Sequence, residues 1–204
     1  MIAIVDYGSG NVGAIADIFK RLKLEHVITS DHAVLRSAER YILPGVGAFD
    51  PTMQTLRESG LVGVLNEEVL GKGKKILGIC VGMQILGDSS DEGALPGLGW
   101  IPGHIRRIDA AAIPGRPKLP HMGWNSVQLK VNSPLLEGVD LERGFYFLHS
   151  YYFSVADEAS VIATVECGGY LPCGVTRGNV YGLQFHPEKS HANGVAVFRN
   201  FATL

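Results

Sequence analysis

The sequence of 204 residues is long enough to build one sizeable hydrophobic core, and this length favours a single domain spanning residues 1–204. Lys and Arg total 18 against 20 Asp and Glu, so the formal charge is -2 and no basic run is present; nucleic acid and membrane surfaces are therefore not expected as partners. Three cysteines, Cys80, Cys167 and Cys173, are too few for a disulfide framework and indicate a reducing, cytoplasmic location.

Apolar strands alternate with helical periods through the first ninety residues. The stretch "IAIVDY" (2–7) predicts a first strand and not a signal peptide, because no basic segment precedes it and an aspartate interrupts the apolar run. Strands and helices that alternate predict a parallel sheet covered on both faces. The expected elements are a helix over 11–23, a strand at 26–29, a short helix opened by the capping residue Ser30, a strand at 41–45, helices through the fifties and sixties, and a strand at 74–80.

The pattern changes at about residue 93, where Gly- and Pro-rich loops begin to separate shorter strand candidates. Neither an internal repeat nor a flexible linker interrupts the sequence. The predicted fold class is α/β, with a mostly parallel central sheet flanked by helices and an antiparallel or mixed second half. In that second half we expect strands at 104–109, 126–130, 144–153, 161–166 and 180–185, and a final helix over about 190–202.

A glycine-flanked cysteine ends the strand at 74–80. In "GICVG", Gly78 and Gly82 lie two positions on either side of Cys80. A strand that turns at once into a helix strains the backbone of its last residue, and glycine at these positions removes side chains that would collide. The turn lifts the thiol out of the sheet to a helix N-terminus, where partial positive charge favours the nucleophilic thiolate. The alternative is a buried cysteine among packing glycines.

A second glycine-rich loop, "LPGVGAFD" (43–50), follows the third strand. Loops at the carboxyl ends of parallel strands surround the usual ligand crevice of such sheets. The backbone amides of Val46 and Gly47, together with the amide of Val81, can form an oxyanion hole for a tetrahedral intermediate. The alternative is a glycine turn that only ends a strand.

His186 and Glu188 stand two residues apart in "GLQFHPEKS" (182–190). Pro187 drives the residue before it into an extended conformation, so both side chains should project from one side of the chain. The carboxylate can then orient the imidazole, which can take a proton from Cys80 and later pass it to a leaving amine. A lone histidine at a strand end is more often structural, but its pairing with Cys80 favours catalysis.

The motifs "GICVGMQ", "LPGVG" and "FHPE" occur in this order and at these separations in class I glutamine amidotransferases, and the chain resembles that family over nearly its whole length. The pieces "DYGSGN" (6–11), "PHMGWN" (120–125) and "FHPEKS" (185–190) are similar to the glutaminase subunits of imidazole glycerol phosphate synthase within the family. The resemblance implies hydrolysis of glutamine to glutamate through a thioester on Cys80. It further implies a heterodimer in histidine biosynthesis, with ammonia passed through a tunnel to a separate cyclase subunit. Neither a metal nor an organic cofactor is suggested.

The resemblance also implies where glutamine binds. An acid can meet the α-ammonium group of the amino acid while backbone amides meet its α-carboxylate. Without the resemblance, Gln84 reads as a surface helix residue, Glu92 as a solvated loop charge and "FYFLHSYYF" (145–153) as an aromatic core strand; the stretch before Glu92 also departs from the family pattern. The positions that match the family's substrate residues are Gly45, Gly47, Gln84, Glu92, His149, Ser150 and Tyr151.

The apolar residues of "PHMGWN" lie in a Pro-rich segment that does not read as core. Met122 and Trp124 are therefore candidates for exposed anchors in an interface with the cyclase subunit. Asn11, at the end of "DYGSGN", is expected to face the same partner. The alternative for Trp124 is a cover for the sheet edge. Trp100 stands where the family suggests an aliphatic residue, and the sequence offers no function for it.

Three hypotheses for function remain. The leading one is a glutaminase subunit whose activity depends on Cys80 and rises when a liganded cyclase is bound. The second is a free-standing cysteine hydrolase of the same architecture, against which the interface-like "PHMGWN" argues. The third is a catalytically silent scaffold that only binds or regulates a partner. The presence of Cys80, His186 and Glu188 together disfavours this third hypothesis.

Overall fold

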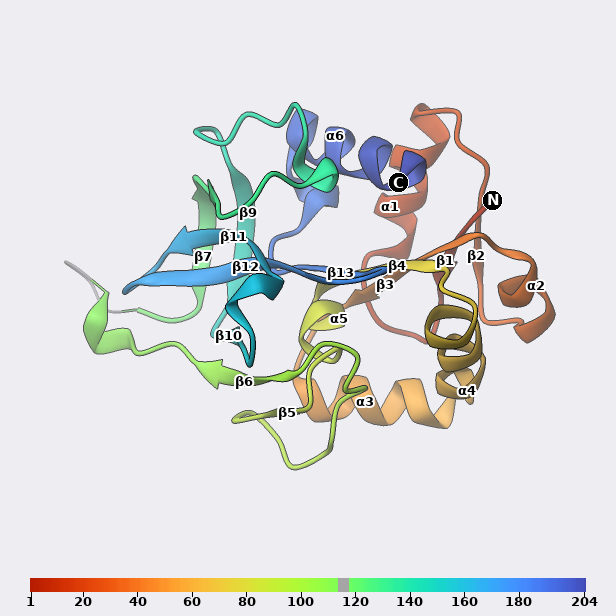
Figure 1. Cartoon of the computed structure of the whole chain (residues 1–204), viewed down its shortest axis with the longest axis horizontal. Coiled ribbons are helices and arrows are strands. Elements are labelled where there is room, and N and C mark those ends of the chain that lie inside the picture. Colours follow the sequence, from red (N-terminus) through yellow and green to blue (C-terminus); the bar gives the residue numbers. More distant parts are fainter. Residues whose placement is uncertain (114–117) are drawn as a thin grey trace.

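The structure, a computed structural model, describes residues 1–113 and 118–204. Within these residues the centre is an eight-stranded mixed sheet in the order β2-β1-β3-β4-β13-β12-β11-β8 (Figure 1). The strands from β2 to β13 run parallel, and those from β13 to β8 pair antiparallel. Along the sheet these strands are His26–Thr29 (β2), Ile2–Val5 (β1), Arg40–Gly45 (β3), Lys75–Cys80 (β4), Val180–Leu183 (β13), Tyr170–Arg177 (β12), Val161–Glu166 (β11) and Gln128–Leu129 (β8).

Two smaller sheets extend the antiparallel half of the molecule. The first has the order β10-β6-β5, and in the second β7 pairs antiparallel with β9. Only Ser150 separates β9 from β10, so the chain passes directly from one small sheet to the other. These strands are Ser89–Ser90 (β5), Gly103–Arg107 (β6), His121–Asn125 (β7), Phe145–His149 (β9) and Tyr151–Val155 (β10).

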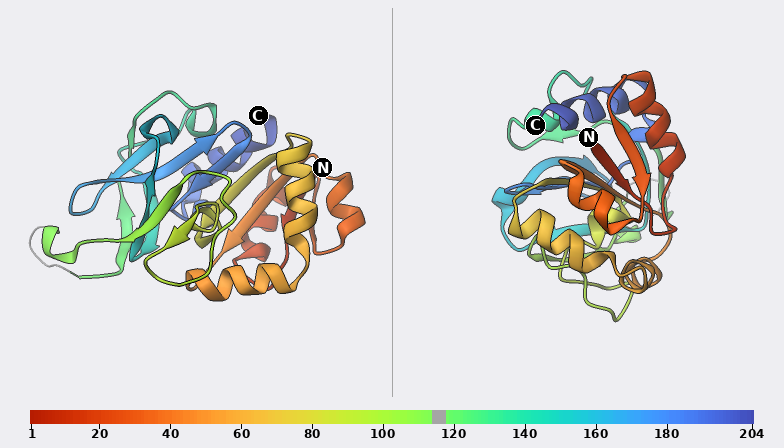
Figure 2. Two further views of the ribbon diagram at one scale, coloured as in Figure 1. Left: turned by 60° about the horizontal axis from the view of Figure 1, so that its bottom comes forward. Right: turned by 90° about the vertical axis from the view of Figure 1, so that its right-hand side faces the viewer.

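Helices cover both faces of the central sheet (Figures 1 and 2). On one face, α1 packs against α6 through Phe19 and Phe198, whose rings meet edge to face with centroids 5.2 Å apart. On the other face lie α3, α4 and the one-turn helix α5, and α2 packs against α4. The helices span Val12–Arg21 (α1), His32–Ser37 (α2), Phe49–Glu58 (α3), Leu61–Leu65 (α4), Val81–Gln84 (α5) and His191–Thr203 (α6). A π-helical turn, Asn66–Gly71, continues α4, and 3-10 turns occupy Ala110–Ala112, Pro134–Leu136, Glu158–Ser160 and Pro187–Lys189.

The parallel strands are buried on both faces. Ile4 of β1, Ile42 of β3 and Leu77 of β4 are inaccessible to solvent. Parallel strands sandwiched between helices need such continuous apolar runs, which explains why these segments do not alternate between polar and apolar residues. In the part of the chain that the structure describes, no helix is long and apolar enough to cross a membrane.

The predicted fold class is confirmed, but several strands of the second half differ from expectation. The single strand expected over 144–153 is divided at Ser150 into β9, which pairs with β7, and β10, which pairs with β6 in a different sheet. β12, which contains Pro172, is not among the predicted strands. The proline lies at an irregularity of the β11–β12 register, where a missing N–H is tolerated.

Three further details also differ. The segment 121–125, expected as loop, forms β7 because it pairs with β9, and the strand expected at 126–130 is reduced to β8. Helix α2 is capped by Asp31 and not by Ser30, since Asp31 Oδ1 accepts hydrogen bonds from Ala33 N (2.8 Å) and Val34 N (3.0 Å). Part of the expected loop-rich stretch, residues 114–117, lies outside the described residues.

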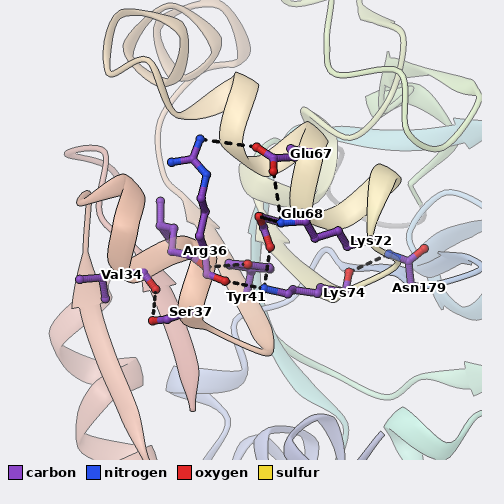
Figure 3. Close-up of polar contacts among 10 residues, drawn as sticks. Val34, Arg36, Ser37, Tyr41, Glu67, Glu68, Lys72, Lys74 and Asn179 are labelled. Carbon is purple, nitrogen blue, oxygen red and sulfur yellow. Dashed lines mark hydrogen bonds and ion pairs between the residues drawn. The ribbon is translucent and has the colours of Figure 1, made fainter.

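A buried carboxylate stabilises the end of the molecule where β4 begins (Figure 3). Glu68 of the π-helical turn is inaccessible, and its two oxygens each lie 2.6 Å from a lysine Nζ, of Lys72 and of Lys74. Lys74 Nζ also donates to Arg36 O (2.8 Å) of α2, so this ion-pair cluster joins three segments. Burial alone raises the pKa of the Glu68 carboxyl, but hydrogen bonds and charge from the two lysines outweigh it and hold the pKa below 4.5.

We predict that Glu68→Gln destabilises the fold at pH 7 by about 1–2 kcal/mol. This is less than the usual loss on breaking a buried ion pair, because Lys72 is half exposed and can turn to solvent. The folded-state pKa of Glu68 is depressed, so its contribution is present above the unfolded-state value near 4.5 and is lost as pH falls through the folded-state value. Urea unfolding of both proteins from pH 7 to pH 3 measures this. Glu67→Gln, at a half-exposed carboxylate, is the matched control; a difference that stays constant with pH would contradict the prediction.

Candidate active site

Cys80 lies in the strained turn that the sequence predicts. Its φ of 56° and ψ of −115° are unusual for a residue with a side chain. A Cβ atom on Gly78 would lie 2.5 Å from Gly82 O, and one on Gly82 would lie 2.0 Å from Leu43 O, so both positions require glycine. Helix α5 after the turn has a single turn, and its dipole is a smaller source of positive charge than the sequence suggested.

His186 and Glu188 come together as expected from their spacing. His186 Nδ1 lies 2.8 Å from Glu188 Oε1, and both side chains are almost fully buried. The same carboxylate oxygen accepts a hydrogen bond from Asn11 Nδ2 (2.9 Å) at the start of α1. The side chain of Asn11, which is predicted at the partner interface, thus also supports the carboxylate that orients the histidine.

The electrostatics of this cluster favour a charged imidazole. Burial alone lowers the pKa of His186, but hydrogen bonding to Cys80 and Glu188 and their negative charges outweigh burial and raise it to about 9. Burial likewise raises the pKa of the Glu188 carboxyl, yet the bonds from His186 and Asn11 hold it below 4.5. An imidazolium held by a carboxylate beside a cysteine sulfur is a suitable environment for a thiolate nucleophile.

A cavity of about 360 Å³ opens onto the thiol. Its lining residues come from segments far apart in the sequence, among them the loops after β1, β3 and β4 and the β9–β10 junction. All but one of the predicted substrate residues line it; Gly45 does not. The lining residues are Asn11, Val46, Gly47, Cys80, Val81, Gln84, Glu92, Pro120, Leu148, His149, Ser150, Tyr151, His186 and Lys189. Gly45 instead packs against the turn, where a Cβ atom would lie 2.5 Å from Gly82 N.

Three lining side chains have partners within the protein. Gln84 is buried and donates through Nε2 to Gln184 Oε1 (2.9 Å), so it is not a surface helix residue. Glu92 Oε2 accepts from Phe49 N (2.9 Å) at the first residue of α3, which places a carboxylate at the rim of the cavity. Burial lowers the pKa of His149 to about 4, so this imidazole is neutral at pH 7.

The loop after β3 does not present Val46 N–H to the thiol. Val46 N donates to Ser9 Oγ (3.0 Å), and Ser9 Oγ lies 3.2 Å from Val46 O. The oxyanion role predicted for this amide therefore requires the Val46 peptide to leave Ser9 and turn. Gly47 has a φ of 101° and open space around it, so the loop has room for such a rotation.

The predicted interface residues lie on β7. Met122 is 63% exposed and Trp124 is 43% exposed, which agrees with anchors on a surface and not with core. Trp124 stacks on His191, with ring planes 8° apart, and the Arg143 guanidinium lies over the Trp124 ring, 5.9 Å from its centroid. Trp100, by contrast, is buried and donates to Asn66 Oδ1 (2.8 Å), so it fastens the loop after β5 to the π-helical turn.

Sequence reasoning missed two residues beside the triad. Lys189 lines the cavity, and its Nζ lies 5.5 Å from the ring centroid of Tyr146. Gln184 is fully buried with its side-chain nitrogen 3.8 Å from Cys80 Sγ. Its position two residues before His186 on an extended segment is the signal that could have revealed it. Among the described residues, no group of three His, Cys, Asp or Glu side chains could hold a metal ion.

Comparison with known proteins agrees with this geometry. The family model "Glutamine amidotransferase class-I" matches residues 3–203. The chain belongs to this family. Its sequence is 47% identical to the imidazole glycerol phosphate synthase subunit HisH of Leptospira borgpetersenii and 47% identical to that of Bdellovibrio bacteriovorus, and each comparison covers 100% of both chains. The predicted membership among glutaminase subunits of this type is thereby confirmed.

Solved structures show the same fold. A structure described as a glutamine amidotransferase matches with a TM-score of 0.73 at 20% identity, covering 100% of both chains. A chain of the PurLQS structure from Thermotoga maritima matches with a TM-score of 0.69 at 21% identity, over 99% of this chain and 97% of the other. At this identity the likeness establishes the fold alone.

We predict that Ser9→Ala raises the rate of glutamine hydrolysis by the isolated chain about two- to fivefold, because it removes a hydrogen bond worth about 1 kcal/mol that holds Val46 N–H away from the thiol. Glutamate release at saturating glutamine measures it. Ser37→Ala, which removes a hydroxyl on α2 that donates to Val34 O, is the matched control. An unchanged or lower rate for Ser9→Ala would count against the inferred rotation.

Proposed function

We propose that the chain hydrolyses L-glutamine to glutamate and ammonia at the triad of Cys80, His186 and Glu188. The observation that carries this proposal is the strained turn that presents the Cys80 thiol to a cavity shared with His186, with Glu188 bonded behind the imidazole. Cys80 Sγ attacks the side-chain amide carbon, and His186 protonates the departing ammonia. The resulting glutamyl thioester is hydrolysed by a water that His186 deprotonates, which releases glutamate and restores the thiol.

The substrate residues have distinct roles in this proposal. Glu92 at the rim receives the α-ammonium group of glutamine, while the Ser150 and Tyr151 backbone receives its α-carboxylate. The neutral His149 contributes a hydrogen-bonding wall and no charge. The amides of Val81, Gly47 and, after its rotation, Val46 stabilise the oxyanion.

We further propose that the ammonia passes to a cyclase subunit that forms imidazole glycerol phosphate, with which this chain assembles as a heterodimer. The relatives are named as subunits of imidazole glycerol phosphate synthase, so a partner subunit is implied. Met122 and Trp124 support a docking surface on β7, because exposed Met and Trp side chains are typical interface anchors. Free Cys80, Cys167 and Cys173 support a cytoplasmic location.

We also propose that residues 1–204 form a single domain. Two observations support this: the central sheet contains strands from both the beginning and the end of the chain, and Asn11 donates a hydrogen bond to Glu188. The free-standing hydrolase remains the second candidate. A high unstimulated rate of glutamine hydrolysis would favour it over the partner-dependent form.

We predict that Cys80→Ala lowers the rate of glutamate release by at least about 10³-fold, because no nucleophile remains to form the thioester. Cys167→Ala, which removes another buried thiol, is the matched control for Cys80→Ala and should retain activity. In a separate measurement, the wild-type rate should rise when the cyclase and its nucleotide ligand are added. Hydrolysis by folded Cys80→Ala at the wild-type rate would refute the proposed chemistry.

For the interface, we predict that Trp124→Ala weakens binding to the cyclase by about tenfold or more, as the loss of a buried aromatic anchor does. Isothermal titration measures the affinity. Leu70→Ala is the matched control: Leu70 is 54% exposed but lies in the π-helical turn before β4, at the opposite end of that strand from Cys80. Equal affinities of the two variants for the cyclase would show that Trp124 and β7 do not form the docking surface.

A further inference from the structure

Gln184 brings a buried carboxamide to the nucleophile. It directly follows β13, its backbone N donates to Cys173 O (2.9 Å), and its side chain is inaccessible. Its Nε2 lies 3.8 Å from Cys80 Sγ, within the range of an N–H···S hydrogen bond, and its Oε1 accepts from Gln84 Nε2. A buried carboxamide must be hydrogen-bonded at both ends, and here one of its partners is the sulfur.

The neighbours of Gln184 determine which end of its amide faces the sulfur. Gln84 Nε2 donates to Tyr151 O (3.3 Å) as well as to Gln184 Oε1 (2.9 Å). Since a backbone carbonyl only accepts, Gln84 must direct its NH₂ group toward Tyr151, and Gln184 must then offer its oxygen to that NH₂ group. The remaining end of Gln184, the NH₂ group, points to Cys80. The reverse orientation would oppose two NH₂ groups and would place an oxygen against the sulfur.

A second row of hydrogen bonds fixes Tyr151 O itself. His149 Nδ1 lies 2.8 Å from this carbonyl and must donate to it, which leaves His149 Nε2 to accept from His121 Nδ1 (2.9 Å). His121 Nε2 in turn accepts from Asn125 Nδ2 (3.3 Å) of β7. Both imidazoles are therefore held in one neutral tautomer, and the direction of donation toward Tyr151 is set from β7.

We propose that Gln184 is a further catalytic residue, whose side-chain N–H holds the Cys80 sulfur and stabilises its thiolate form. This inference rests on the proposed role of Cys80 as nucleophile. A hydrogen bond from an amide is independent of pH, whereas the other support for the thiolate, the His186 imidazolium, changes charge during the reaction. Gln184 therefore stabilises the sulfur both before the attack on glutamine and as the thiolate leaves when the thioester is hydrolysed, whichever protonation state His186 has at that stage.

The other groups near the Cys80 sulfur determine whether the hydrogen bond from Gln184 could be replaced. Among the described residues, the titratable groups that interact electrostatically with Cys80 are His186, with Glu188 behind it, and Tyr7 after β1; Glu92, His149 and Lys189 line the same cavity as the thiol. Burial raises the pKa of Tyr7, and its hydroxyl donates to Pro44 O, so Tyr7 is neutral and donates away from the sulfur. The loss of the Gln184 donor is therefore not replaced by another neutral side chain of this set.

The test compares Gln184→Met, which keeps the length of the side chain but removes the donor, with Gln184→Glu, which places an acceptor beside the sulfur. The readout is the rate of Cys80 alkylation by iodoacetamide from pH 5 to pH 10, quantified on the Cys80 peptide by mass spectrometry. Only the thiolate reacts, so this rate follows the thiolate fraction. Cys173→Ala, a buried change on the neighbouring strand β12, is the matched control for general loss of packing.

We predict that Gln184→Met slows Cys80 alkylation at pH 7 about five- to tenfold, moves the profile to higher pH, and lowers kcat for glutamine with little change in KM. Gln184→Glu moves the profile further in the same direction, while Cys173→Ala leaves it unchanged. A folded Gln184→Met protein with the wild-type profile would overturn the proposal, as would identical profiles for both variants. Should Gln184→Met not fold, the isosteric Gln184→Glu decides alone, and an unshifted profile for it overturns the proposal.

Alkylation needs no glutamine turnover, so this test is separate from that of the proposed function. A wild-type chain that does not hydrolyse glutamine would refute the glutaminase proposal while the alkylation profiles still report on the contact between Gln184 and Cys80. Conversely, unchanged profiles in a chain that hydrolyses glutamine would refute only the role of Gln184.

Discussion

The site depends on the close approach of three backbone segments at positions without side chains. Gly45, Gly78 and Gly82 meet where β3, β4 and α5 come together, and a Cβ atom on any of them would lie 2.5 Å or less from a backbone atom. This contact allows the chain to reverse within one residue and leaves the strain at Cys80, whose φ is 56°. The thiol consequently emerges at the carboxyl edge of the parallel strands, which is the edge where such sheets bind ligands.

The neighbours of β4 in the sheet supply the rest of the machinery. β3 lies on one side and contributes the glycine-rich loop, and β13 lies on the other and leads to Gln184 and His186. The start of α1 reaches Glu188 through Asn11, so the beginning and the end of the chain meet behind the imidazole. Charge is thereby arranged in a line from carboxylate to imidazolium to sulfur, within a largely buried environment that strengthens each interaction.

The sequence was sufficient for the features that depend on short spacings. Gly78 and Gly82 around Cys80, and Pro187 between His186 and Glu188, each dictate local geometry, so the turn and the imidazole–carboxylate pair could be predicted. The sequence was not sufficient for features that depend on contacts between residues far apart along the chain. The bond between Val46 N and Ser9 Oγ, the tautomers of His121 and His149, and the bond from Asn11 to Glu188 join residues at least 28 positions apart. β7 and β12 also form through pairing, against the Gly and Pro residues of their own sequences.

The central claim is that Cys80 forms a covalent glutamyl intermediate during turnover. The most direct measurement is to mix the chain with L-glutamine and the liganded cyclase subunit, quench with acid during steady state, and map covalent adducts by tandem mass spectrometry. The account predicts a glutamyl group on Cys80 and none on Cys167 or Cys173. Sustained glutamate release with no adduct on Cys80, or with an adduct on another residue, would contradict it.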